Sequence, residues 1–137
     1  MSDRRIDAFF YGLFMDSEVL KKFEVEIVNP RKAYADDFAL SIGNRATLVA
    51  TIGARAYGMV FSVTHAELKK LYCGVGLEDY CPEAIFVNLM GEKSLPAICY
   101  SLLTAPLPDE ANFEYAEQLR VTLTKLKFPP DYIASVE

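Results

Sequence analysis

Apolar and polar residues alternate along several short segments of this chain, which predicts strands with one buried face. The clearest alternation places Phe38, Leu40 and Ile42 at every second position, and a strand is expected over residues 32–42. Apolar or β-branched runs predict further strands over residues 7–11, 46–52, 57–63, 84–90 and 95–103. Turns are expected at residues 43–44, at Gly53 and at residues 91–94, where glycine allows the chain to reverse.

Helical spacing of apolar residues, together with capping residues, predicts helices between these strands. Asp16 can cap a helix that runs to about Phe23. Thr64 and Glu67 form a capping box at the start of a second helix, which ends before a loop over residues 73–82. A third helix is expected over residues 110–127, followed by a short turn capped by Asp131. The order of elements predicts a single domain over residues 1–137, with an α+β fold whose strands could curl into a small barrel.

The composition narrows the class of protein and of partner. The chain carries 14 Lys and Arg against 19 Asp and Glu, a net charge of −5, so it lacks the basic excess that binds nucleic-acid phosphates. No run approaches the ~18 apolar residues that span a bilayer, and three cysteines without CxxC spacing fit reduced thiols. We therefore expect a cytoplasmic protein that binds neither nucleic acid nor membrane; its oligomeric state is not readable. His65 is the sole histidine, so no metal or organic cofactor is expected.

The stretch from Tyr11 to Asp16 is the candidate ligand-binding loop. Gly12 follows a predicted strand, where a glycine permits a sharp turn and lets a ligand approach the main chain. The backbone N–H groups of Leu13, Phe14 and Met15, at the start of a helix, could hold a carboxylate. An ordinary strand-to-helix turn has the same features, so the loop alone does not establish a function.

Several motifs, in order along the chain, resemble those of the gamma-glutamylcyclotransferase-like family, which includes plant avirulence-induced proteins and gamma-glutamylamine cyclotransferases. Tyr11-Gly12 resembles the family's YGTL or YGSN loop, and residues 46–49 and 57–61 resemble its AT(I/L) and G.(V/I)(Y/F) strands. Residues 68–71 are similar to its L..LD helix. Its hairpin, closing helix and tail are matched by Tyr80, Ile85, Val87, Tyr115, Pro129 and Tyr132. The resemblance implies a small mixed β-barrel flanked by helices.

The resemblance also implies a reaction, in which the α-amine of a gamma-glutamyl group attacks its own γ-amide carbonyl and gives 5-oxoproline and a free amine. In the family, a glutamate in the motif LDxxEG carries the proton. The same frame runs here from Leu71 to Gly76, with Tyr72 at the aspartate and Val75 at the glutamate. Valine carries no proton, and loss of a positioned general acid or base costs about 10²–10⁴-fold in rate. Glu78, in the same loop, is the candidate substitute.

Two functions from different classes follow. The first is a binding protein whose cavity holds a small carboxylate- or amide-bearing ligand, with the activity of the family altered or lost. The second is an active gamma-glutamyl (amine) cyclotransferase, a transferase or amide lyase that uses Glu78 as general acid and base. In either case a small molecule is the expected partner. The residues expected to bind it are Tyr11, Gly12, Leu13, Phe14, Met15, Val75, Gly76, Tyr80 and Tyr115.

Overall fold

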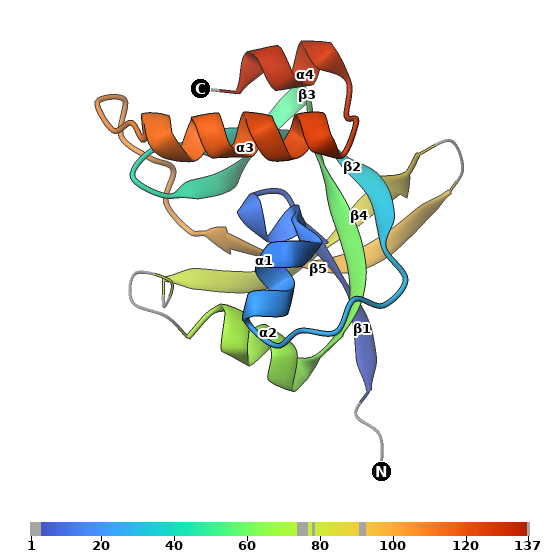
Figure 1. Ribbon diagram of the computed structural model, residues 1–137. Coiled ribbons are helices and arrows are strands. Elements are labelled where there is room, and N and C mark those ends of the chain that lie inside the picture. Colours follow the sequence, from blue (N-terminus) through green and yellow to red (C-terminus); the bar gives the residue numbers. More distant parts are fainter. Residues whose placement is uncertain (1–3, 74–76, 78, 91–92, 137) are drawn as a thin grey trace.

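Five strands of this protein close into a barrel, and helices pack against its outside (Figure 1). The structure, a computed structural model, describes residues 4–73, 77, 79–90 and 93–136. The strands are β1 (Arg5–Phe10), β2 (Arg31–Ile42), β3 (Ala46–Thr64), β4 (Tyr80–Leu89) and β5 (Ser94–Leu102). The helices are α1 (Ser17–Lys22), α2 (His65–Leu71), α3 (Phe113–Lys125) and α4 (Pro130–Ser135), and a 3-10 turn, η1 (Leu13–Met15), precedes α1.

Strands of both orientations close the barrel, in the order β1-β3-β2-β4-β5. Neighbours in this order pair antiparallel from β1 through to β5. β5 then returns to β1 in parallel, where Ile98 lies opposite Ala8. The predicted α+β fold, a small mixed β-barrel flanked by helices, is therefore confirmed.

β3 is one long strand where the sequence predicted two strands and a turn at Gly53. The register between β2 and β3 shifts between Asp36 and Phe38, so a bulge interrupts the pairing there. Gly53 lies in this bulge with φ of +87°, a conformation that glycine adopts without strain. Its N–H donates a hydrogen bond to Asp37 Oδ1 at 2.9 Å. The glycine therefore bends the strand without reversing it, and pairing continues on both sides.

Predicted caps and boundaries agree with the structure for the first two helices. The Asp16 side chain caps α1 by accepting from the N–H of Glu18. Thr64 and Glu67 form both hydrogen bonds of the capping box at the start of α2. β4 begins at Tyr80, inside the loop expected over residues 73–82. The turn expected over residues 91–94 lies partly outside the described residues.

The start of each C-terminal helix differs from the prediction. α3 begins at Phe113 and not near residue 110, because the Asn112 side chain accepts from the N–H of Tyr115 and caps the helix there. Asp131 lies in the first turn of α4 and does not cap it, since Pro129 occupies the N-cap position. Neither difference changes the order of the elements.

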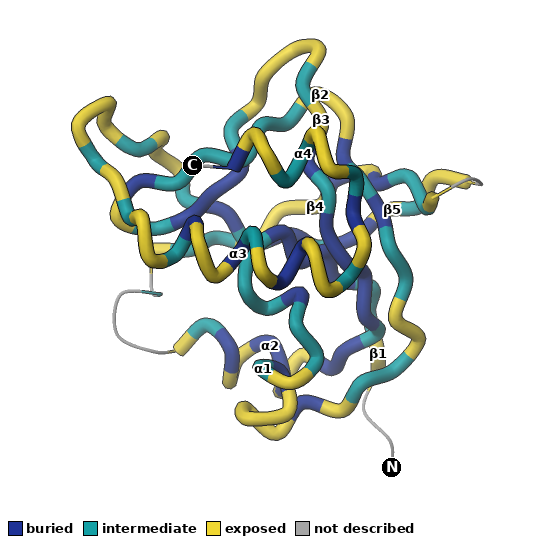
Figure 2. The backbone as a smooth tube through the Cα atoms, turned by 45° about the horizontal axis from the view of Figure 1, so that its top comes forward, coloured by how far each residue is buried: buried dark blue, intermediate teal, exposed yellow. Residues whose placement is uncertain are grey.

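Two apolar cores lie on the two sides of the sheet. The β1 side chains alternate between them, with Phe9 in the interior of the barrel and Phe10 under the helices. The interior core draws on all five strands and contains small side chains, among them Ala33, Ala35, Ala46, Ala56 and Ala97. The outer core joins β1 and β3 to the helices through larger side chains, among them Leu20, Leu68, Leu71, Leu119 and Leu123. The strands at the centre of the molecule are accordingly buried (Figure 2).

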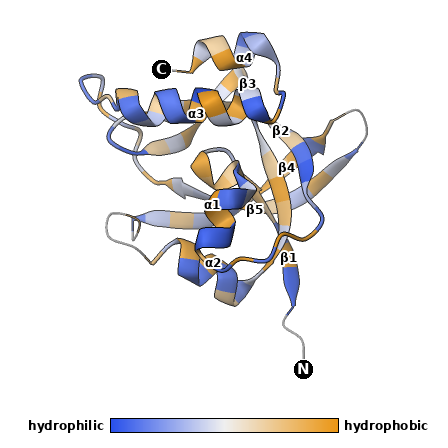
Figure 3. Ribbon diagram, viewed as in Figure 1, coloured by the Kyte–Doolittle hydropathy of each residue, from blue (hydrophilic) through white to orange (hydrophobic). Residues whose placement is uncertain are grey.

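One face of α3 covers the outer core. Ala116, Leu119 and Leu123 are buried, as the helical spacing predicted, whereas Val121 is 61% exposed. Buried and exposed residues alternate along this helix in Figure 2, and Figure 3 shows hydrophilic and hydrophobic residues mixed along it. Among the described residues, no helix is both long enough and apolar enough to cross a bilayer.

Replacing Leu119 tests the packing of α3. Leu119→Ala should lower the free energy of unfolding by about 2–5 kcal/mol, because it leaves a cavity at a fully buried position. Val121→Ala, on the exposed side of the same helix, is the matched control and should change it by less than about 0.5 kcal/mol. Urea unfolding measures both values, and equal losses would contradict this placement of the helix.

Candidate functional site

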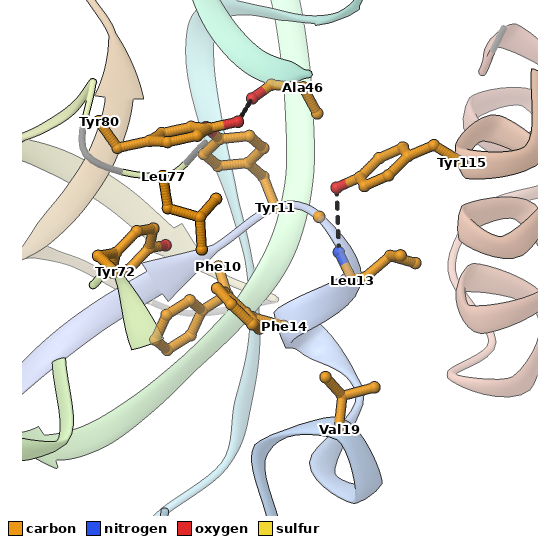
Figure 4. Close-up of a pocket in the computed structure, with 11 residues that line it drawn as sticks. Phe10, Tyr11, Leu13, Phe14, Val19, Ala46, Tyr72, Leu77, Tyr80 and Tyr115 are labelled. Carbon is orange, nitrogen blue, oxygen red and sulfur yellow. Dashed lines mark hydrogen bonds between the residues drawn. The ribbon is translucent and has the colours of Figure 1, made fainter. Parts of the chain in front are cut away.

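A pocket of about 250 Å³ opens at one end of the barrel, beside the loop that the sequence singled out (Figure 4). The end of β1 and the loop after it form one wall, with Phe10, Tyr11, Gly12, Leu13 and Phe14. Other elements complete the lining with Val19, Ala46, Tyr72, Leu77, Tyr80 and Tyr115. The lining is therefore mostly apolar and aromatic, with tyrosine hydroxyls as its main polar groups.

Gly12 allows α3 to approach the loop. A Cβ atom at Gly12 would lie 2.2 Å from the hydroxyl oxygen of Tyr115, so any larger residue would displace the tyrosine. The same hydroxyl accepts a hydrogen bond from the N–H of Leu13, with a distance of 3.2 Å between nitrogen and oxygen. A glycine predicted to admit a ligand thus admits a side chain of this protein, 102 positions away from Leu13.

The backbone donors of the loop are already engaged in part. The sequence predicted that the N–H groups of Leu13, Phe14 and Met15 could hold a carboxylate. In the structure Leu13 donates to Tyr115, and Met15 donates to the carbonyl oxygen of Gly12 at 3.0 Å within η1. The Met15 side chain is 1% exposed and packs in the outer core, so it lies away from the pocket lining. A carboxylate held by all three N–H groups would have to displace these two internal hydrogen bonds.

Four tyrosines bring hydroxyl groups to the pocket, and their hydrogen bonds differ. Tyr11 donates to the carbonyl oxygen of Tyr100 at 2.8 Å, and Tyr80 donates to the carbonyl oxygen of Ala46. Tyr115 acts as an acceptor toward Leu13, which leaves its own proton available for a ligand. The Tyr72 hydroxyl forms no hydrogen bond with any residue that the structure describes. In Figure 4, Tyr72 and Tyr115 lie on opposite sides of the pocket.

Burial keeps these phenols protonated. It raises the pKa of Tyr72 and of Tyr11 well above the ordinary value of 10.0, and it also raises the pKa of Tyr115. Burial likewise raises the pKa of Tyr80 to about 12. At neutral pH the pocket therefore offers neutral O–H donors, from Tyr72 and Tyr115, to a hydrogen-bond acceptor.

Charged groups are absent from the described part of the lining. The nearest charged pair in sequence is Arg45 with Asp79, whose side chains form an exposed ion pair at 3.0 Å beside the lining residues Ala46 and Tyr80. In the described ranges, no group of three or more His, Cys, Asp or Glu side chains is placed to hold a metal ion. The described lining thus suits an uncharged ligand better than a charged one, because an unpaired charge is costly to bury.

The sequence found part of this lining and missed the rest. Tyr11, Gly12, Leu13, Phe14, Tyr80 and Tyr115 all line the pocket. Val75, Gly76 and Glu78 lie outside the described residues, so their predicted roles stay predictions. The prediction missed Phe10, Val19, Ala46, Tyr72 and Leu77. The one available signal for Tyr72 was its place in the frame Leu71–Gly76, where it stands at the family's aspartate.

The comparisons with known proteins give the fold a name. The sequence matches no protein-family model, and no curated protein is significantly similar to it. Solved structures do match: one described as a gamma-glutamyl cyclotransferase has a TM-score of 0.77 at 18% identity, over 97% of this chain and 88% of that one. This chain has the gamma-glutamylcyclotransferase-like fold.

Further structures with this fold match at lower scores. A gamma-glutamyl cyclotransferase from yeast, described as specific to glutathione, has a TM-score of 0.60 at 15% identity, covering 94% of this chain and 91% of its own. An AIG2-like protein from Mus musculus has a TM-score of 0.59 at 16% identity, covering 85% and 94%. Identities this low establish the fold alone, because the function depends on the residues of the site.

The close approach of Gly12 and Tyr115 can be tested by a double-mutant cycle. Gly12→Ala should destabilise the protein by about 1–3 kcal/mol, because the new methyl group overlaps the hydroxyl. Tyr115→Phe should cost about 0.5–1.5 kcal/mol through the lost hydrogen bond to Leu13. The double variant should lose less than the sum, since the ring carbon that bears the hydroxyl lies 3.5 Å from the added Cβ. Additive losses in urea unfolding would contradict the contact.

The raised pKa values predict a loss of stability in alkali. A phenol with a raised pKa in the folded state stabilises the fold fully below its unfolded pKa of 10.0, and this stabilisation decreases as pH rises toward the folded value of about 12 for Tyr80. The free energy of unfolding should therefore decrease above pH 10.0. Urea unfolding as a function of pH measures it, with Tyr72→Phe expected to flatten the dependence. A slope unchanged in this variant would contradict the buried, protonated state of Tyr72.

Proposed function

We propose that this protein binds a small, uncharged, amide- or carbonyl-bearing molecule in the pocket beside Gly12 and does not turn it over. The observation that carries the proposal is the pair of available O–H donors, Tyr72 and Tyr115, set in an apolar lining. A carbonyl oxygen can accept from one of these donors, while the rest of the ligand contacts aromatic and aliphatic side chains.

An amide suits this lining better than a carboxylate. No described residue of the lining is cationic, and the Leu13 and Met15 N–H groups are engaged inside the protein. Transfer of a carboxylate into such a site without a cation costs far more than transfer of a neutral amide that finds its hydrogen bonds. The ligand class is therefore narrower than the sequence predicted.

We infer that the ligand is not turned over because the described part of the site lacks an evident group to carry the proton. The resemblance places Val75 where the family has its catalytic glutamate, and the described lining contributes no carboxylate. Cyclisation needs a group that accepts a proton from the attacking amine and passes one to the leaving amine.

The free thiols of Cys73, Cys81 and Cys99 are consistent with the cytoplasmic location that we also propose.

An active gamma-glutamyl (amine) cyclotransferase is the second candidate. The match to a structure described as a gamma-glutamyl cyclotransferase, over 97% of this chain, favours it. In that case Glu78 would supply the carboxylate. The two candidates predict different outcomes for one assay.

The assay measures 5-oxoproline released from gamma-glutamyl amines, together with calorimetric binding of butanamide. We expect saturable butanamide binding and no 5-oxoproline above the blank from the wild type. Glu78→Gln is compared with Glu83→Gln, whose parent carboxylate is exposed on β4. Product that disappears in Glu78→Gln and persists in Glu83→Gln would overturn the binding proposal in favour of the enzyme. Release of 5-oxoproline by Val75→Glu would support the inference that the valine at this position removes the proton carrier.

A further inference from the structure

The pocket shares two aromatic residues, Tyr72 and Tyr80, with a second hollow. This second hollow measures about 410 Å³ and lies beyond Tyr72, where the end of α2 faces Tyr100 of β5. Tyr72 and Tyr80 line both spaces, whereas Phe14 and Tyr115 line the pocket alone. The Tyr72 ring contacts both Phe14, which lines only the pocket, and Tyr100, which lines only the second hollow, so it lies between the two spaces and is called the partition.

Contacts on several sides hold the partition in place. The Tyr72 ring stacks on the Tyr100 ring, with 4.1 Å between centroids and 10° between planes. Phe14 meets it edge-on at 5.5 Å and 86°, and Tyr80 contacts it at 5.8 Å. Aromatic pairs in such geometries stabilise one another beyond the area that they bury. The ring is therefore fixed and cannot turn aside for a ligand without losing these contacts.

The two spaces differ in chemistry. The described lining of the pocket carries no charge, whereas the second hollow is lined by Lys69 and Lys70 in the last turn of α2. The Lys70 Nζ donates to the carbonyl oxygen of Glu24 at 2.9 Å. A ligand that crossed the partition would therefore meet cationic groups at its far end.

We propose that Tyr72 determines the ligand specificity of this site: its ring limits ligands to short, uncharged amides and excludes longer ones whose tails would reach Lys69 and Lys70. The inference rests on the proposed function and adds a size limit and a charge limit to it. Tyr72 stands at the position of the family's aspartate, and on this proposal its ring limits the length of the ligand. Val75 stands at the position of the glutamate in the same frame.

Three probes and four proteins test the partition by calorimetry. The probes are butanamide, octanamide and the monoamide of octanedioic acid. The wild type should bind butanamide more tightly than octanamide. Tyr72→Ala should reverse this preference by at least about tenfold, because each newly buried methylene adds roughly fourfold in affinity. The monoamide should gain still more affinity in Tyr72→Ala, because its carboxylate would reach Lys69 and Lys70, and added salt should reduce this gain. Tyr72→Leu also removes the stacked ring and replaces Tyr72→Ala if that variant does not fold.

Tyr72→Phe is the matched control, since it keeps the ring and removes the hydroxyl. It should bind butanamide about 2–10-fold more weakly and keep the wild-type preference for short amides. If every protein binds all three probes with the same length dependence, the partition is wrong and the proposed function stands. If no protein binds any probe, both fail. If only the opened variants bind, the partition stands and the proposed function of the wild type fails.

Discussion

Closure of five strands around small side chains is the constraint on which this structure depends. The interior contains Ala33, Ala35, Ala56 and Ala97, beside a few larger residues such as Phe9. Strands can approach closely around alanine, and a barrel this narrow is filled by its own side chains. Of the interior core, Tyr11 and Ala46 line the pocket beside Gly12, whereas Ala33, Ala35, Ala56 and Ala97 do not. The pocket therefore lies at one end of the closed barrel, where the loop after β1 and a side chain of α3 meet the strands.

The contact between Gly12 and Tyr115 links that barrel to the C-terminal helix. It fixes the side of the pocket that faces α3 and uses one backbone donor of the loop. On the opposite side, Tyr72 is fixed by stacking on Tyr100. The pocket thus has aromatic groups on two sides, each with a hydroxyl in an apolar setting, and on our proposal shape and hydrogen-bond donors would set its selectivity.

Local signals in the sequence predicted the elements, and long-range contacts decided the site. Strand alternation, the caps at Asp16 and Thr64 and the stripe on α3 involve neighbours a few residues apart, so the sequence contains them directly. Gly53 was misread because its role depends on Asp37 in another strand. The role of Gly12 was read as access for a ligand, because nothing local reveals that Tyr115 occupies the space beside it. Tyr72 was read only as a lost aspartate for the same reason.

The tyrosines of this pocket would be poor proton carriers for a cyclisation. A general base must be deprotonated at the working pH and must lie within reach of the proton that it takes. Burial raises the pKa of Tyr72 well above 10.0 and also raises the pKa of Tyr115, so both phenols keep their protons at neutral pH. The same burial that makes these groups reliable donors makes them ineffective bases. On our proposal, such a pocket would bind a carbonyl in its ground state and give little help to a nitrogen that must lose a proton. This asymmetry is why we infer binding without turnover from a fold that other proteins use for cyclisation.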